Sequence, residues 1–145
     1  MQQVNMRDRS GRVLTTLLVH PDRLPVVAPI IAGRYDLRGI SGIRRVLDLG
    51  AAEGAFANWI WAVTGGCWVD CWEPDETLAT LCASQLPPGG RMLHQYEIWD
   101  VSYERTIISM RDELEHTYDI VRLCVDEPHW RGEMATIVDY QVRGC

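Results

Sequence analysis

From residue 45 onward, short apolar runs alternate with segments of helical character, and this alternation constrains the fold more than any other feature. The runs cover residues 45–49, 67–72, 92–99 and 120–125, and the helical segments cover 55–63, 75–86 and 103–116. Apolar runs of this length are typical of strands that are buried on both faces. Helices between such strands indicate right-handed crossovers, so we predict a parallel sheet with helices on both faces.

The first 43 residues follow a different pattern. Residues 4–20 favour a hairpin, because an Asp-Arg-Ser-Gly turn separates two β-prone segments. A short helix is expected after Pro21, although Pro29 would strain its interior. We therefore predict an N-terminal arm at residues 1–43 and an α/β domain at residues 44–145, in which residues 131–142 add one last helix or strand.

Composition is that of a globular protein without a membrane partner. The chain has 145 residues with 47% apolar and 23% charged side chains, which is enough for one domain with a real core. No apolar run approaches the roughly 18–20 residues that span a bilayer, and the first residues do not resemble a secretory signal. The five cysteines include no C-x-x-C pair and are expected to be buried thiols. We expect a cytoplasmic protein without a metal site.

Charge is unevenly distributed along the chain. Residues 1–45 carry eight arginines against three acidic residues, or +5, whereas residues 46–145 carry six against seventeen, or −11. The chain contains no lysine. The basic first third could steer an anionic partner. A solvated basic surface explains it more simply, so nucleic-acid binding is the less favoured interpretation.

The segment from Val46 to Phe56 carries the chemistry. A strand ends there, a loop of small residues turns, and a helix starts. Gly50, Ala52 and Gly54 alternate in the loop, so its backbone can approach a ligand closely. The following helix offers free N–H groups and a positive dipole end. Asp48, at the end of the strand, could accept a hydrogen bond from a ligand's ammonium group or organise the loop.

A second acidic residue ends the next strand. Glu73 lies nineteen residues after Gly54, where a carboxylate can accept both hydroxyls of an adenosine ribose. Taken alone, Asp48 or Glu73 would be interpreted as a polar residue at a strand end, and the glycines as turn residues. Their ordered combination is much more specific, and it predicts a pocket for an adenosine cofactor.

The loop spacing selects among such cofactors. A dinucleotide fingerprint reads G-x-G-x-x-G, whereas this loop reads G-x-A-x-G-A with an acidic residue two positions before Gly50. This pattern favours S-adenosylmethionine. The segment Asp48-Leu49-Gly50-Ala51-Ala52-Glu53-Gly54, followed by Trp72-Glu73-Pro74-Asp75, resembles class I S-adenosylmethionine-dependent methyltransferases. It is most similar to the FkbM-like O-methyltransferases, over about residues 44–126.

The resemblance implies a role for each part of the site. The Gly50–Gly54 loop would hold the amino-acid end of the cofactor and Glu73 its ribose. Asp100 would bond the adenine amino group, with Val101 beside the ring. The expected cofactor-binding residues are Asp48, Gly50, Ala51, Ala52, Gly54, Phe56, Glu73, Pro74, Asp100 and Val101.

The end of the fourth strand is where catalytic residues are expected. The FkbM-like pattern there reads Lys-x-Asp-x-Glu-Gly. Arg122 matches its Lys, but Cys124 stands at the Asp and Asp126 at the Glu. His129 could act as general base for an acceptor hydroxyl, with Asp126 orienting it. A packed turn with a hydrogen-bonded His129 explains the same residues.

Together these features predict a Rossmann-like three-layer α/β sandwich with a mostly parallel sheet of order 3-2-1-4. The resemblance implies seven strands, so the fold would be truncated on its C-terminal side. We expect methyl transfer to oxygen or nitrogen of a small or macromolecular acceptor, with a second subunit or another partner completing the site. A non-catalytic S-adenosylmethionine-binding module and, less favoured, an NAD-dependent dehydrogenase are the alternatives.

Overall fold

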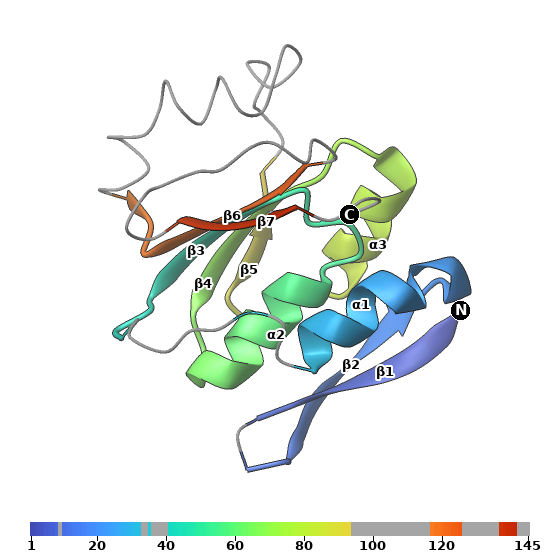
Figure 1. Ribbon diagram of the computed structural model, residues 1–145, viewed down its shortest axis with the longest axis horizontal. Coiled ribbons are helices and arrows are strands. Elements are labelled where there is room, and N and C mark those ends of the chain that lie inside the picture. Colours follow the sequence, from blue (N-terminus) through green and yellow to red (C-terminus); the bar gives the residue numbers. More distant parts are fainter. Residues whose placement is uncertain (9, 33–34, 36–40, 94–116, 126–136, 142–145) are drawn as a thin grey trace.

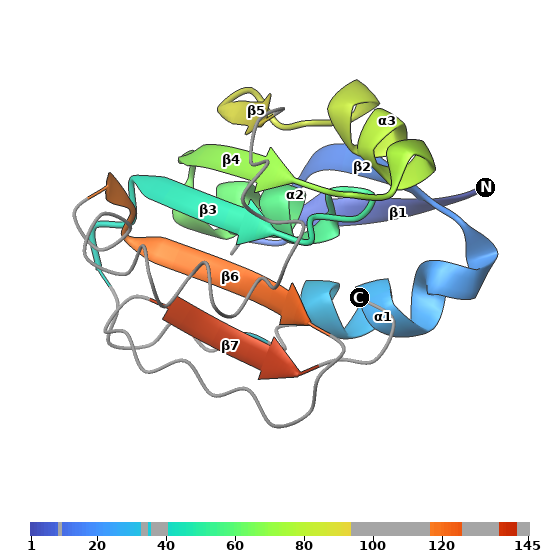
Figure 2. The ribbon, with the colours of Figure 1, turned by 90° about the horizontal axis from the view of Figure 1, so that it is seen from above.

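The computed structural model describes residues 1–8, 10–32, 35, 41–93, 117–125 and 137–141. Its centre is a five-stranded sheet of order β5-β4-β3-β6-β7 in which all pairings are parallel. The strands are β3 (Arg45–Leu49), β4 (Trp68–Trp72), β5 (Gly90–Met92), β6 (Ile120–Val125) and β7 (Ile137–Gln141). The arrowheads of the long strands point the same way in Figure 2. The predicted Rossmann-like fold and strand order are confirmed, and the last predicted element is a strand.

The structure describes three α-helices beside the sheet. They are α1 (Leu24–Ile31), α2 (Ala55–Thr64) and α3 (Glu76–Ser84), and η1 (Pro21–Arg23) is a short 3-10 helix before α1 (Figure 1). Local contacts fix the end of α2 and the start of α3. Gly65 closes α2 in the left-handed conformation, and Asp75 caps α3 by accepting from Leu78 N–H at 2.9 Å. The predicted helix at 103–116 lies outside the described residues.

The predicted boundary of the third strand is wrong. β5 begins at Gly90, two residues before the predicted start, because Gly90 N–H closes a turn on Pro87 O at 2.8 Å. Val69 N–H donates to Gly89 O at 2.9 Å, so pairing with β4 starts directly after that turn. Residues 94–99 of the predicted strand lie outside the described part.

The N-terminal hairpin of β1 (Gln2–Arg7) and β2 (Val13–Val19) forms as predicted and lies on the far side of α2 from the sheet (Figure 1). Its Met6 and Leu17 belong to the same hydrophobic cluster as Phe56 of α2 and Val69 of β4. The division of the chain at residue 43 stays a prediction. Three cysteines are free and buried, as expected: Cys67, Cys71 and Cys82. None of the described helices is long and apolar enough to cross a membrane.

Candidate functional site

The loop between β3 and α2 has left-handed backbone at every second residue. The φ angles are +83° at Gly50, +50° at Ala52 and +91° at Gly54. Glycine reaches this region without strain, whereas an L side chain is disfavoured there. Gly54 also lacks room, because a Cβ would lie 3.2 Å from Cys82 Sγ. The backbone path itself therefore favours glycine at 50 and 54, whereas Ala52 adopts the left-handed region despite its Cβ.

The start of α2 offers backbone N–H groups without a side-chain cap. Gly54 is the N-cap residue, and the first turn contains no acidic residue. Because the first N–H groups of a helix lack partners within the helix, such an end attracts an anionic group. This end of α2 lies at the carboxyl edge of the sheet, where open parallel sheets bind their ligands.

Glu73 is connected directly to the loop. Its Oε1 accepts from Ala52 N–H at 2.7 Å, and its Oε2 accepts from Asp75 N–H at 2.9 Å. Burial raises the pKa of Glu73, and the two backbone N–H groups partly oppose this shift. Each carboxylate oxygen has a further lone pair for a ligand hydroxyl. The structure thus brings the two predicted motifs together, with Pro74 between Glu73 and the cap of α3.

Asp48 forms a buried ion pair that the sequence does not predict. Asp48 and Arg122 are neighbours in the β3–β6 pairing, and Arg122 Nη1 lies 2.7 Å from Asp48 Oδ1. Burial raises the pKa of Asp48, whereas the guanidinium lowers it. The other oxygen, Oδ2, is buried and has no hydrogen-bond partner among the described residues. A buried acceptor without a partner is costly and indicates a missing donor.

Arg122 is held from several sides. Its Nε donates to Tyr35 Oη at 2.7 Å, and its Nη1 also donates to Gly50 O at 3.2 Å. The guanidinium lies 5.1 Å from the ring centroid of Phe56. Burial is the largest single influence and lowers the pKa of Arg122, but Asp48 and Tyr35 together outweigh it and the net shift is upward. Phe56 is buried below the loop against Tyr35, with ring centroids 4.8 Å apart.

Further contacts of Glu53, Gln85 and Asn58, also missed in the sequence, hold the loop in place. Glu53 side-chain exposure is only 2%, and its Oε2 pairs with Arg23 Nε at 2.9 Å. Gln85 Nε2 donates to Glu53 O at 2.7 Å and to Leu18 O at 3.0 Å, and Leu18 N–H donates back to Gln85 Oε1 at 2.9 Å. Asn58 Nδ2 donates to Gly54 O at 2.9 Å. The partners of Glu53 and Gln85 lie 30 or more residues away in the chain, so no local sequence signal reveals them, whereas Asn58 and Gly54 are one helical turn apart.

Four predicted site residues lie outside the described part of the chain: Asp100, Val101, Asp126 and His129. Their roles stay predictions. Within the described residues, no group of three or more His, Cys, Asp or Glu side chains is arranged to hold a metal.

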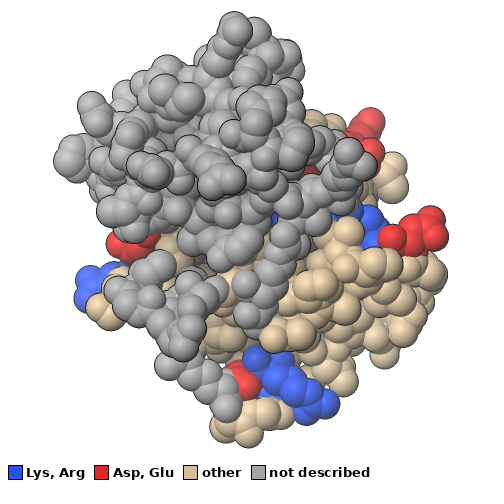
Figure 3. Space-filling model, viewed as in Figure 1, with Lys and Arg blue, Asp and Glu red and all other residues tan. Residues whose placement is uncertain are grey.

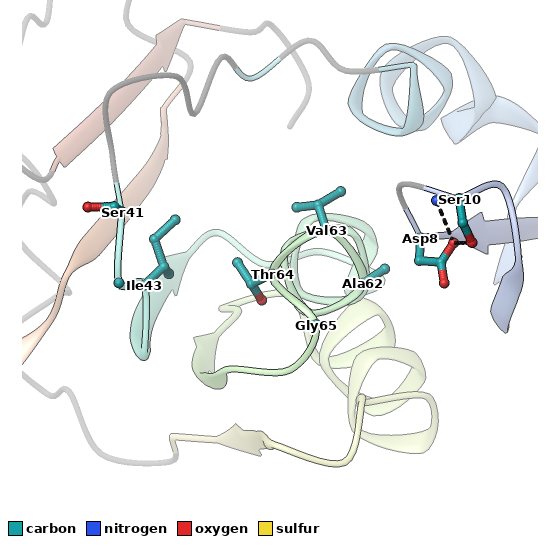
Figure 4. Close-up of a pocket in the computed structure, with 9 residues that line it drawn as sticks. Asp8, Ser10, Ser41, Ile43, Ala62, Val63, Thr64 and Gly65 are labelled. Atoms are coloured by element: carbon teal, nitrogen blue, oxygen red, sulfur yellow. Dashed lines mark hydrogen bonds between the residues drawn. The ribbon is translucent and has the colours of Figure 1, made fainter.

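Clefts lie at both ends of the sheet. One of about 400 Å³ adjoins Glu73 and lies between α3 and β5, lined by Trp72, Glu73, Glu76, Ala79, Thr80, Ala83, Met92 and Leu93. A larger hollow of about 710 Å³ lies at the carboxyl end of α2, between Ser41 and the hairpin residues Asp8 and Ser10 (Figure 4). Because Gly54 is at the opposite end of α2, only the first cleft adjoins the predicted pocket.

On the face shown in Figure 3, basic and acidic side chains of the described residues lie in small mixed groups. The arginine excess of the first 45 residues therefore gives no broad basic surface on this face.

Comparisons with solved structures give partial matches. One is the plantazolicin methyltransferase BpumL in complex with SAH, 14% identical over 69% of this chain and 34% of that chain, with a TM-score of 0.42. Another is BpumL with a triazolic desmethylPZN analog and SAH, 12% identical over 72% of this chain and 36% of that chain, with a TM-score of 0.45. This chain spans about a third of the chains it matches. No protein-family model and no curated protein matches. Likeness at this level is no evidence of a shared activity, and the fold assignment stands on the strand order itself.

Proposed function

We propose that the protein binds S-adenosylmethionine at the carboxyl edge of β3 and β4 and transfers its methyl group to an oxygen or nitrogen acceptor. The observation that carries this proposal is the hydrogen bond from Ala52 N–H to Glu73 Oε1 at 2.7 Å. It joins the small-residue loop to the carboxylate that ends the neighbouring strand. The two sequence motifs therefore form one site.

The residues present fit this cofactor at two of its groups. The buried, unpartnered Oδ2 of Asp48 suits the ammonium of an amino acid, and the uncapped N-terminus of α2 suits the carboxylate. Glu73 would accept from the ribose hydroxyls. Asp100 and Val101 would contact the adenine, as the family resemblance implies. When bound, the cofactor supplies a methyl group that is already activated for displacement.

For a reaction of this kind, the protein mainly has to position the acceptor and exclude water. The buried contacts of Glu53 and Gln85 fix the loop before a ligand arrives, so little ordering is required on binding. Asp126 and His129 remain our candidates for orienting the acceptor and removing its proton. We propose that a partner subunit completes the acceptor site.

Methyl transfer is tested by incubating the protein with S-adenosylmethionine that carries a tritiated methyl group, together with small hydroxyl- and amine-bearing acceptors or a cell extract. We expect label in one acceptor and S-adenosylhomocysteine in equal amount, both reduced in His129→Ala. Tight cofactor binding without transfer to any acceptor would favour the non-catalytic module. Selective binding of NAD would instead favour a dehydrogenase and contradict the cofactor assignment.

A further inference from the structure

An exposed tryptophan stands at the opposite end of the sheet from the candidate site. Trp68, the first residue of β4, exposes 66% of its surface. It is paired with Arg45, the first residue of β3. Tryptophan and arginine are both enriched in binding surfaces relative to the rest of a protein surface.

Two arginines neighbour Trp68 in the sheet: Trp68 N–H donates to Arg44 O at 2.8 Å, and Arg45 is its strand partner. Arg44 and Arg45 are exposed, and no ion pair among the described residues uses either guanidinium. Their backbone is fixed, because both N–H groups donate to Asp119 Oδ2 at 2.7 and 3.0 Å. The Arg45 guanidinium lies 5.8 Å from the ring centroid of Tyr118. The Arg45 guanidinium therefore lines the same cleft as Trp68, and no ion pair among the described residues uses its charge.

A third arginine is oriented by a buried acid. Arg91 Nε and Nη2 each lie 3.0 Å from an oxygen of Asp70, and Tyr118 Oη donates to Asp70 Oδ2 at 2.6 Å. The Arg91 side chain nevertheless remains 64% exposed. The three strands enclose a cleft of about 330 Å³, lined by Arg45, Trp68, Asp70, Gly89, Gly90 and Arg91. This volume is in the range of small-ligand sites, which begins at about 300 Å³.

We propose that this cleft binds a nucleobase together with its phosphate, either as a free nucleotide or within a single strand of nucleic acid. Trp68 would stack on the base, since every base has a π-face, and Arg45 and Arg91, which line the same cleft, would contact the phosphate. An acidic peptide would use the arginines but would have no need of the ring. The cleft is distinct from the proposed cofactor pocket, because the four residue steps of β4 separate its two ends by about 13 Å.

The test is fluorescence anisotropy with labelled single-stranded DNA and RNA of about ten nucleotides, a length that spans one typical binding site. Binding is measured with S-adenosylhomocysteine at saturation, and AMP serves as competitor. We expect Trp68→Ala to weaken binding by about 5- to 100-fold, whereas Trp68→Phe retains most of it. Arg45→Gln should weaken binding and reduce the salt slope by about 0.7. Arg12→Gln, which changes an exposed hairpin arginine away from the cleft, should have no effect.

Displacement of the strand by AMP would identify a nucleotide site, and binding of the strand alone would identify a nucleic-acid site; either supports the shared chemistry. The proposal is overturned if neither ligand binds at millimolar protein, if Trp68→Ala binds as wild type does, or if poly-glutamate competes as well as the strand. Failure of S-adenosylhomocysteine to bind would affect only the proposed function.

Discussion

Arg122 of β6 faces Asp48 of β3 across the centre of the sheet, with its Nη1 2.7 Å from Asp48 Oδ1. The pair lies directly below the loop, because the same nitrogen also donates to Gly50 O. The charge below the loop of the proposed pocket thus depends on both Asp48 of β3 and Arg122 of β6.

Replacing Arg122 by Met should leave Asp48 as an unpaired buried acid. We expect a loss of about 3–5 kcal/mol in the free energy of unfolding, measured by urea denaturation. Without Arg122 the pKa of Asp48 rises further above its unfolded value, so the loss should be smaller at pH 5 than at pH 8. The double variant with Asp48→Asn should recover part of the stability. A loss that is independent of pH and unchanged in the double variant would show that the ion pair is not its cause.

Glu73 should make stability depend on pH. Burial raises its folded-state pKa above 4.5, so its contribution is fully present below the unfolded pKa and is lost as the pH rises through the folded value. The stability of wild type relative to Glu73→Gln should therefore fall as the pH rises above about 4.5. Denaturation curves of both proteins between pH 4 and 8 measure this difference. A constant or rising difference would contradict the burial of this carboxylate.

Two glycines offer a matched comparison. Gly54 and Gly65 both have left-handed backbone, at +91° and +75°, but only Gly54 has an atom close to the position of a Cβ. Alanine at Gly65 should cost about 1–2 kcal/mol for the backbone alone. Gly54→Ala should cost more, because Cys82 Sγ must move, and it should also weaken cofactor binding. If Gly54→Ala and Gly65→Ala lost the same stability and bound the cofactor with the same affinity, the loop would not be part of the cofactor site.

Gln85 connects the hairpin to the loop through three side-chain hydrogen bonds. At about 1 kcal/mol each, Gln85→Ala should lower the free energy of unfolding by about 2–3 kcal/mol. Hydrogen exchange should become faster at Leu18 N–H, which loses its acceptor. Gln3→Ala, an exposed position of β1, is the control and should change neither quantity. Unchanged exchange at Leu18 in Gln85→Ala would contradict the connection.

Local features of the fold could be predicted from the sequence. The apolar run 45–49, the loop from Gly50 to Gly54 and the helix after it form as predicted, because strand burial and positive φ leave a signal within a few residues. The order of β3, β4 and β5 also follows from the short crossovers between them, whereas the pairing of β6 with β3 comes after a long connection. The boundary at β5 could not be predicted, since it depends on a turn hydrogen bond at Gly90.

Side-chain partners brought together by the fold were not predictable. Tyr35 and Arg122 are 87 residues apart, and Leu18 and Gln85 are 67 apart. Their types suggest no pairing, and only the folded sheet brings them together. Likewise, Glu73 was predicted as a ligand for ribose, but the structure also makes it an acceptor for the loop N–H of Ala52. Trp68 and Arg45 meet only because β3 and β4 pair in register.

Binding of S-adenosylmethionine is the central claim, and a thermal-shift comparison with S-adenosylmethionine, S-adenosylhomocysteine and NAD tests it most directly. Either adenosyl ligand at about 100 times its Kd should stabilise wild type by about 2.7 kcal/mol, which raises Tm by several degrees. Glu73→Ala should lose most of this shift, and Asp22→Ala, which removes an exposed carboxylate, should keep it. No shift at millimolar S-adenosylmethionine, or a larger shift with NAD, would contradict the account.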